Sequence, residues 1–342
     1  MTIRPERTRT YHGLLFDSTY WDSYSPRPGD IVVSTSAKAG TTWVQVICGL
    51  LIFQNPEPTA PLDDLSPWFD LRLTPPAVTV PLLEAQTHRR FIKSHLPMDG
   101  IPYYDDMRYI VVGRDTRDVF MSWVKHLENM APHSIAMFNA KSGAELLAVA
   151  DKYEIDLPPE QRAVFAKMRP WEGPVFPDPD VIADRRTYWR KWITTGAFPW
   201  EQDGWPAVSH HAHLNTWWRH RGLENILFVH FNDLLADLDG EMRRIAAFLD
   251  IPVDEGAWPV LVDAATFKSM KRKADLTAPG TSFGAWKDPK EFFHKGTNKR
   301  WHEVLTDDDI ALYRDNIART LEPASARWLE EGRLAFADPR NL

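Results

Sequence analysis

Four basic side chains stand where they could bind an anionic group and move a proton. Lys38 lies in a loop of small residues. Lys93 and His95 lie together at the end of an apolar run, and Arg114 ends another. Lysine and arginine bind phosphate or sulfate oxygens, and histidine exchanges a proton near neutral pH because its usual pKa is ~6.5. These residue types predict a site for a phosphorylated or sulfated ligand.

The loop around Lys38 stands between a predicted strand and a predicted helix. The β-branched run 31–33 precedes it and the apolar segment 44–51 follows it. Backbone N–H groups of such a loop and the N-terminus of the helix attract an anion. The loop departs from the nucleotide pattern G-x-x-x-x-G-K-[ST], because Lys38 comes two residues before Gly40. Taken alone, the loop could also be an ordinary strand-to-helix turn with a solvated lysine.

Three further apolar runs predict the rest of a sheet, and they cover residues 89–95, 109–114 and 226–231. Predicted helices at 118–127 and 238–249 alternate with them. This alternation predicts an α/β fold: a P-loop-like three-layer sandwich with a central parallel sheet. Ligands of such sheets bind beyond the carboxyl ends of the strands, where the four basic side chains and the turn 231–233 fall.

Ser122 lies eight residues after Arg114, inside the predicted helix. A serine on this helix and an arginine at the end of the strand before it could share one phosphate. Considered without the rest of the chain, Arg114 would more often pair with a nearby aspartate.

The composition favours one globular domain. The chain has 342 residues and a net charge of −7, without a long basic block, which argues against nucleic-acid binding. We expect a single domain over 1–342, with a core at about 28–128 and 222–301 and a helical, irregular insertion at about 130–206. The stretches 55–81 and 268–299 are expected to be irregular, and 307–321 to be a final helix.

The single cysteine, Cys48, cannot form an internal disulfide and is expected to be a buried free thiol. This cysteine usage fits a reducing, cytoplasmic location. The sequence contains no apolar stretch long enough for a membrane span or a leader peptide. The fifteen tryptophans are expected mostly to fill the core.

The histidines at 210, 211 and 213 form the one dense histidine cluster of the sequence. No cysteine or close carboxylate completes a set of metal ligands beside them. We therefore expect the start of a solvated helix there and no metal site.

Four segments, in order, resemble the cytosolic-type sulfotransferase family, in particular its bacterial members. The donor of this family is 3′-phosphoadenosine 5′-phosphosulfate. The segments are Ser-Ala-Lys-Ala-Gly-Thr-Thr-Trp at 36–43, Lys-Ser-His-Leu-Pro at 93–97, the stretch 109–118 with Ser122, and Phe-His-Lys-Gly at 293–296. The pair Trp217-Trp218 before the run 226–233 also matches a recurrent family pattern. Each segment is a moderate signal, and four in order are a strong one.

The resemblance implies a role for each matching residue. Lys38 would hold the bridging and sulfuryl oxygens. Thr41 and Thr42 would bind the 5′-phosphate, and Trp43 and Phe267 would lie at the adenine. The 3′-phosphate would be bound by Arg114, Ser122, Lys295 and Gly296, and the implied donor-binding set is completed by Ala39, Gly40, Phe231, Thr266 and His294.

Two departures from the family pattern concern the 3′-phosphate. His294 stands where the family often has arginine, and Lys299-Arg300-Trp301 stands where it often has Gly-Asp-Trp. Arg300 could supply the missing phosphate contact. The family's short dimerisation motif is not found before residue 266, so the oligomeric state is left open.

The implied reaction moves a sulfuryl group to a hydroxyl, less commonly an amine. The acceptor would be a small-molecule alcohol, a phenol or a glycolipid. His95 would remove the acceptor proton, Lys38 and Lys93 would stabilise the developing charge, and no metal would be required.

Two other functions are weighed against this one. A phosphotransferase using ATP and magnesium would need Ser or Thr after the loop lysine, where Ala39 stands, and an aspartate at the strand end, where Arg114 stands. The second is a non-catalytic nucleotide-binding protein. Such a protein would be expected to lack a catalytic base, yet Lys93 and His95 are both present.

Overall fold

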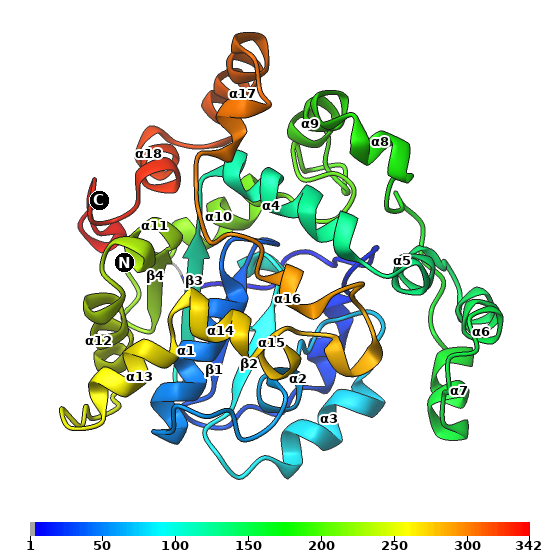
Figure 1. The fold of residues 1–342 in the computed structure, drawn as a ribbon, viewed down its shortest axis with the longest axis horizontal. Coiled ribbons are helices and arrows are strands. Elements are labelled where there is room, and N and C mark those ends of the chain that lie inside the picture. Colours follow the sequence, from blue (N-terminus) through cyan, green and yellow to red (C-terminus); the bar gives the residue numbers. More distant parts are fainter. Residues whose placement is uncertain (1–3) are drawn as a thin grey trace.

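The computed structural model describes residues 4–342. Four parallel strands form one sheet in the order β2-β1-β3-β4, with helices packed around it (Figure 1). The strands are β1 (Ile31–Thr35), β2 (Phe91–Ser94), β3 (Arg108–Gly113) and β4 (Ile226–His230). β1 lies between β2 and β3, with Ile31 in register with Phe91 on one side and Arg108 on the other. All four predicted strands are confirmed, with small shifts at their ends.

Alternate residues of the strands enter two different cores, so both faces of the sheet are covered. Val32, Tyr109 and Val111 belong to one core, which also contains side chains of α4 (Thr116–Asn129), α10 (His210–Trp218), α17 (Asp307–Thr320) and α18 (Pro323–Glu331). Ile31 and Ile110 belong to the other core, which includes α1 (Thr41–Phe53), α11 (Phe231–Ala236), α12 (Leu238–Phe248) and α13 (Trp258–Ala264). This is the predicted three-layer α/β arrangement, and it explains why β3 is apolar on both faces.

The segment 130–206 contains five helices that extend along one side of the molecule (Figure 1). They are α5 (Pro132–Asn139), α6 (Gly143–Lys152), α7 (Pro159–Ala166), α8 (Pro179–Ala183) and α9 (Arg185–Thr194). Trp171, Phe176 and Trp189 from this segment pack into the larger core. The division of the chain into a core and an insertion stays a prediction.

Two stretches expected to be irregular contain helices, so this expectation is wrong in part. Residues 55–81 include α2 (Leu62–Leu65) and the start of α3 (Pro76–Ala85). Residues 268–299 include most of α14 (Phe267–Arg272), together with α15 (Ala274–Thr277) and α16 (Pro289–Phe292). Proline begins α3 and α16, where its missing N–H costs no hydrogen bond because the first N–H groups of a helix are unpaired anyway.

The histidine cluster does begin helix α10, but the expectation that it is solvated is wrong. His210, His211 and His213 are buried. Nε2 of His210 lies 2.7 Å from the carbonyl oxygen of Arg114, and Nε2 of His213 lies 2.9 Å from Oγ of Ser34. The cluster therefore supports the ends of β1 and β3. Within residues 4–342, no three His, Cys, Asp or Glu side chains are grouped closely enough to hold a metal ion.

Two other expectations concern burial and hydropathy. Cys48 is a buried free thiol, as predicted, and most of the tryptophans lie in the two cores. Among the helices of residues 4–342, none is both long enough and apolar enough to cross a lipid bilayer.

Candidate active site

A cavity of about 310 Å³ opens at the carboxyl ends of the strands. Lys38 follows β1, His95 follows β2, Arg114 follows β3 and Phe231 follows β4, and all four residues line this cavity. Lys93, near the end of β2, lines it as well. The parallel sheet thus brings the predicted basic residues together, because the carboxyl ends of its strands share one edge.

Lys38 is held at the entrance to helix α1 by unusual backbone geometry. Its φ of 66° lies in the left-handed region, and Gly40, with φ of 123°, precedes the helix. The Lys38 Nζ atom lies 3.2 Å from Nδ1 of His126 and 4.2 Å from the centre of the Phe292 ring. Burial, with the nearby positive charges of Lys93 and Arg114, lowers the pKa of Lys38 to about 7. A bound anion would restore the protonated form.

Lys93 and His95 share the ring of Trp68 as a neighbour. The Trp68 ring centre lies 4.3 Å from Nζ of Lys93 and 4.6 Å from the centre of the His95 ring. Nε1 of Trp68 donates a hydrogen bond of 2.6 Å to the buried carboxylate of Asp70, which fixes the indole. Burial lowers the pKa of Lys93 to about 8, although Asp63 and Asp70 act in the opposite direction.

His95 is fixed in the tautomer that a general base needs. Its Nδ1 lies 2.7 Å from the carbonyl oxygen of Thr35. A carbonyl can only accept, so Nδ1 carries the hydrogen and Nε2 has a free lone pair. Burial and the charge of Lys93 lower the pKa of His95 well below its usual value, so the ring is neutral near pH 7.

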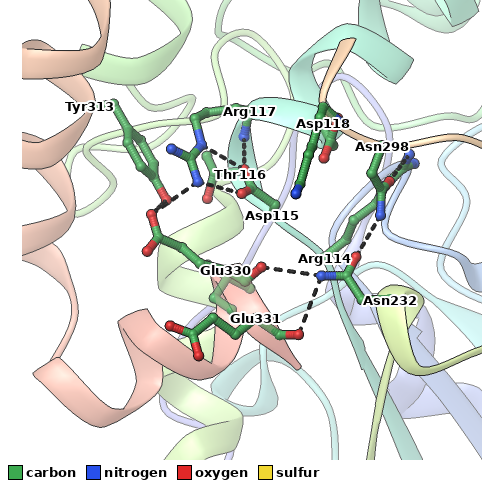
Figure 2. Close-up of polar contacts among 12 residues, drawn as sticks. Arg114, Asp115, Thr116, Arg117, Asp118, Asn232, Asn298, Tyr313, Glu330 and Glu331 are labelled. Atoms are coloured by element: carbon green, nitrogen blue, oxygen red, sulfur yellow. Dashed lines mark hydrogen bonds and ion pairs between the residues drawn. The ribbon is translucent and has the colours of Figure 1, made fainter. Parts of the chain in front are cut away.

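Arg114 is oriented by neutral groups rather than by a carboxylate. Its Nε and Nη2 atoms donate to Oδ1 of Asn298 at 3.2 and 2.9 Å, and Nη1 donates to the carbonyl of Lys38 at 3.2 Å. Within residues 4–342, Arg114 forms no ion pair, and the adjacent Asp115 pairs with Arg117 instead (Figure 2). Burial lowers the pKa of Arg114 to about 10.

Most of the remaining residues expected to bind the donor also line the cavity. They are Gly40, Thr41, Thr42, Trp43, Ser122, Phe267, His294, Lys295 and Gly296. The two that do not are Ala39, which is buried in the core, and Thr266, whose hydroxyl accepts the N–H of Ser269 at the start of α14. Their contacts with a donor stay predictions.

Gly296 and Phe267, which both line the cavity, lie in contact with each other. Gly296 has a φ of 63°, and a Cβ at this position would lie 2.8 Å from the Phe267 ring. Only glycine therefore lets the loop lie this close to the ring.

His294 and Arg300 both line the cavity but differ in their polar partners. Nδ1 of His294 lies 3.2 Å from a carboxylate oxygen of Glu291. Arg300 lines the cavity, and its buried Nε has no hydrogen-bond partner among residues 4–342.

Sequence reasoning missed four residues of the site: Trp68, Asp70, His126 and Asn298. Trp68, Asp70 and Asn298 carried no pattern that suggested a role. His126 alone carried a signal, because it lies one helical turn after Ser122 and so shares its side of α4. The other three reach the site through the fold of distant segments.

The walls of the cavity away from the basic groups are largely apolar. Their side chains come from the N-terminal segment, from the region around α3, and from α5 and the loop before α8; they include Leu15, Leu71, Val78, Leu82, Phe138 and Phe176. Such walls fit an apolar portion of a ligand.

Comparisons with known proteins show the family to which the chain belongs. Residues 28–323 match the family described as the sulfotransferase domain. A glycolipid sulfotransferase of Mycobacterium bovis is 33% identical over 97% of this chain and 96% of its own length. Human sulfotransferase 1C2 is 22% identical over 90% and 88% of the two chains.

Two solved structures share the fold. Mouse sulfotransferase SULT7A1 complexed with PAP has a TM-score of 0.62 and 16% identity, covering 94% of this chain and 98% of its own. Retinol dehydratase in complex with androsterone and inactive cofactor PAP has a TM-score of 0.60 and 18% identity, covering 89% and 84%. The chain therefore belongs to the sulfotransferase domain family and is a sulfotransferase.

Proposed function

We propose that the protein transfers a sulfuryl group from 3′-phosphoadenosine 5′-phosphosulfate to a hydroxyl of an acceptor with a large apolar part, a glycolipid or another lipid alcohol. The observation that carries the proposal is that one cavity combines a base, His95, with buried cations and apolar walls. The cations fit the donor's charge, and the walls fit the acceptor.

The donor suits the basic end of the cavity because three cations, Lys38, Lys93 and Arg114, line it together. Lys38, Lys93 and Arg114 all have lowered pKa values, mainly because each is removed from water. A multiply charged anion would reverse this penalty. In this proposal Lys38 and the N-terminus of α1 hold the phosphosulfate, and Arg114 with Ser122 holds the 3′-phosphate. The solved structures of mouse sulfotransferase SULT7A1 and of retinol dehydratase are complexes with PAP, which agrees with this choice.

The bound donor supplies the sulfuryl group, and the chain supplies the base and the positive charge. Nε2 of His95 takes the acceptor's proton as the acceptor oxygen bonds to sulfur. The bond between sulfur and the 5′-phosphate oxygen breaks, and Lys38 stabilises the charge left on that oxygen. Lys93 stabilises the charge on the transferred group.

Two observations support a lipid-type acceptor. The apolar walls offer a place for a hydrocarbon or aromatic portion, and relatives at 33% identity bear the name glycolipid sulfotransferase. Phenols and small alcohols are the competing acceptors. Membership of the sulfotransferase family sets aside the phosphotransferase alternative.

A binding experiment tests the donor half of the proposal. Adenosine 3′,5′-bisphosphate should bind tightly without metal, as measured by calorimetry, and R114A should weaken it strongly. ATP with magnesium serves as the comparison ligand. Metal-dependent binding of ATP without binding of the bisphosphate would overturn the proposal.

A further inference from the structure

We propose that Asn298 is a positioning residue for the donor's 3′-phosphate, which holds Arg114 in place without neutralising it. The inference rests on the proposed donor site. It is carried by a chain of hydrogen bonds that runs from Arg114 through Asn298 and Asn232 to the end of helix α18 (Figure 2).

The direction of every hydrogen bond in this chain is fixed at its two ends. The carbonyls of Glu330 and Glu331 can only accept, and they take the amide N–H groups of Asn232 at 3.2 and 3.4 Å. Oδ1 of Asn232 then accepts from Nδ2 of Asn298. This leaves Oδ1 of Asn298 facing Arg114, which can only donate. If either amide were flipped, two acceptor oxygens or two N–H donors would face each other, so both orientations are fixed.

An amide at position 298 can orient Arg114 without competing with a bound phosphate, which a carboxylate could not do. A carboxylate would orient Arg114 through the same two hydrogen bonds, but it would also compete with a phosphate for the guanidinium charge. The amide oxygen orients the guanidinium without adding a negative charge next to it. Burial, aided by the charge of Arg300, lowers the pKa of Arg114, although the nearby Asp118 and Asp115 act in the opposite direction without forming an ion pair with it.

This series of hydrogen bonds ends at helix α18. The match to the sulfotransferase domain family stops at residue 323, so almost all of α18 lies beyond it. Helix α18 is anchored where it can act on Arg114. A Cβ at Gly113, the residue before Arg114, would clash with the Trp328 ring. Nε2 of His230 also lies 3.0 Å from the carbonyl of Leu329. The C-terminal carbonyls of α18, unpaired within the helix, thus act as fixed acceptors for the chain.

The test separates the 3′-phosphate from the rest of the nucleotide. Calorimetry compares adenosine 3′,5′-bisphosphate with adenosine 5′-phosphate, and the ratio of their affinities measures the contribution of the 3′-phosphate. In N298A this ratio should fall roughly tenfold, because hydrogen bonds that orient a charged group are lost. The affinity for adenosine 5′-phosphate should not change. N232A should lower the ratio less, because Arg114 keeps its own contacts with residue 298.

Two further variants sharpen the result. N298D keeps the acceptor for Arg114 but adds a negative charge, and it should lower the ratio at least as much as N298A. T297V changes the neighbouring side chain, which makes no hydrogen bond within residues 4–342, and should leave the ratio unchanged. N298S provides a second small substitution if N298A is poorly folded.

The possible results distinguish a failure of the proposed donor site from a failure of the proposed role of Asn298. A wild-type protein that binds both nucleotides equally would overturn the proposed donor site itself. A normal wild-type ratio that survives in N298A and N298D would overturn the role of Asn298 alone. An equal loss of affinity for both nucleotides would show a purely structural role and would also overturn it.

Discussion

Nδ1 of His95 lies 2.7 Å from the carbonyl oxygen of Thr35, the last residue of β1. The proposed base on one strand end is thus held in its tautomer by the neighbouring strand. The two strands are paired in parallel up to Ser34 and Ser94, so the sheet places His95 directly beside Thr35. The base is therefore preorganised before any acceptor enters.

Replacing the base should remove transfer and leave donor binding intact. H95A should lower kcat by about 10²–10⁴-fold, the usual contribution of a general base. The affinity for adenosine 3′,5′-bisphosphate should change little, because His95 carries no charge near pH 7. Steady-state kinetics and calorimetry measure the two effects. A variant that keeps its kcat would assign the base to another residue.

Donor binding should take up protons. Lys38 has a pKa of about 7 in the free protein, so it is mostly neutral at pH 8, and a bound anion favours its charged form. Lys93, with a pKa of about 8, adds a smaller uptake. The affinity should therefore fall as the pH rises from 7 to 9. Titration of the bisphosphate at pH 8 in two buffers of different ionisation heat measures the uptake.

The matched control for proton uptake is K38M, which should lose most of it. A heat of binding that is independent of the buffer in the wild-type protein would show that Lys38 is already charged.

The hydrogen bond from the Trp68 indole to Asp70 should support the rate of transfer. W68F keeps an aromatic ring but frees it from Asp70, so Lys93 and His95 should lose their fixed neighbour. We expect kcat to fall roughly tenfold or more, because small displacements at a reaction centre are costly. Trp21 also donates to Asp70, at 2.9 Å, but does not line the cavity. W21F is the control, and an equal loss in both variants would point to Asp70 alone.

His126 should hold the Lys38 side chain through a hydrogen bond of 3.2 Å. H126L removes the acceptor and should lower kcat by about tenfold, as expected for a lost hydrogen bond to a charged group. H126Q keeps an acceptor oxygen and should recover part of the activity. An unchanged kcat in H126L would show that the contact has no role in the reaction.

Acceptor affinity should grow with the length of an apolar chain. For a series of alkyl glucosides, KM should fall by about fourfold per methylene, corresponding to ~0.8 kcal/mol for each buried group, until the cavity is filled. L71D should flatten this dependence, because it places a charge in the apolar wall. Equal KM values along the series would favour a small acceptor.

The sequence was sufficient to predict the site's basic residues because they follow apolar runs. Lys38, His95 and Arg114 each come directly after or close to a strand end, and parallel strands present their carboxyl ends at one edge. Such placement depends on local pattern and topology alone, so it can be predicted without knowing any side-chain contact.

The residues that orient these groups could not be predicted in this way. Asn298 lies 184 residues from Arg114, and His210 lies 96 residues from it. A polar residue in a loop or a histidine at a helix start is usually solvated, so the sequence favoured that interpretation for His210–His213. Tertiary packing buries the cluster because its hydrogen bonds are satisfied by strand ends far away in the chain.

The most direct measurement follows the sulfuryl group itself. Purified protein is incubated with 3′-phosphoadenosine 5′-[³⁵S]phosphosulfate and a long-chain alkyl glucoside, without metal, and the labelled lipid is quantified. We expect labelled product with the wild-type protein and almost none with H95A at equal occupancy of the donor site. Transfer that is undiminished in H95A, or no transfer to any hydroxyl acceptor despite bound donor, would contradict it.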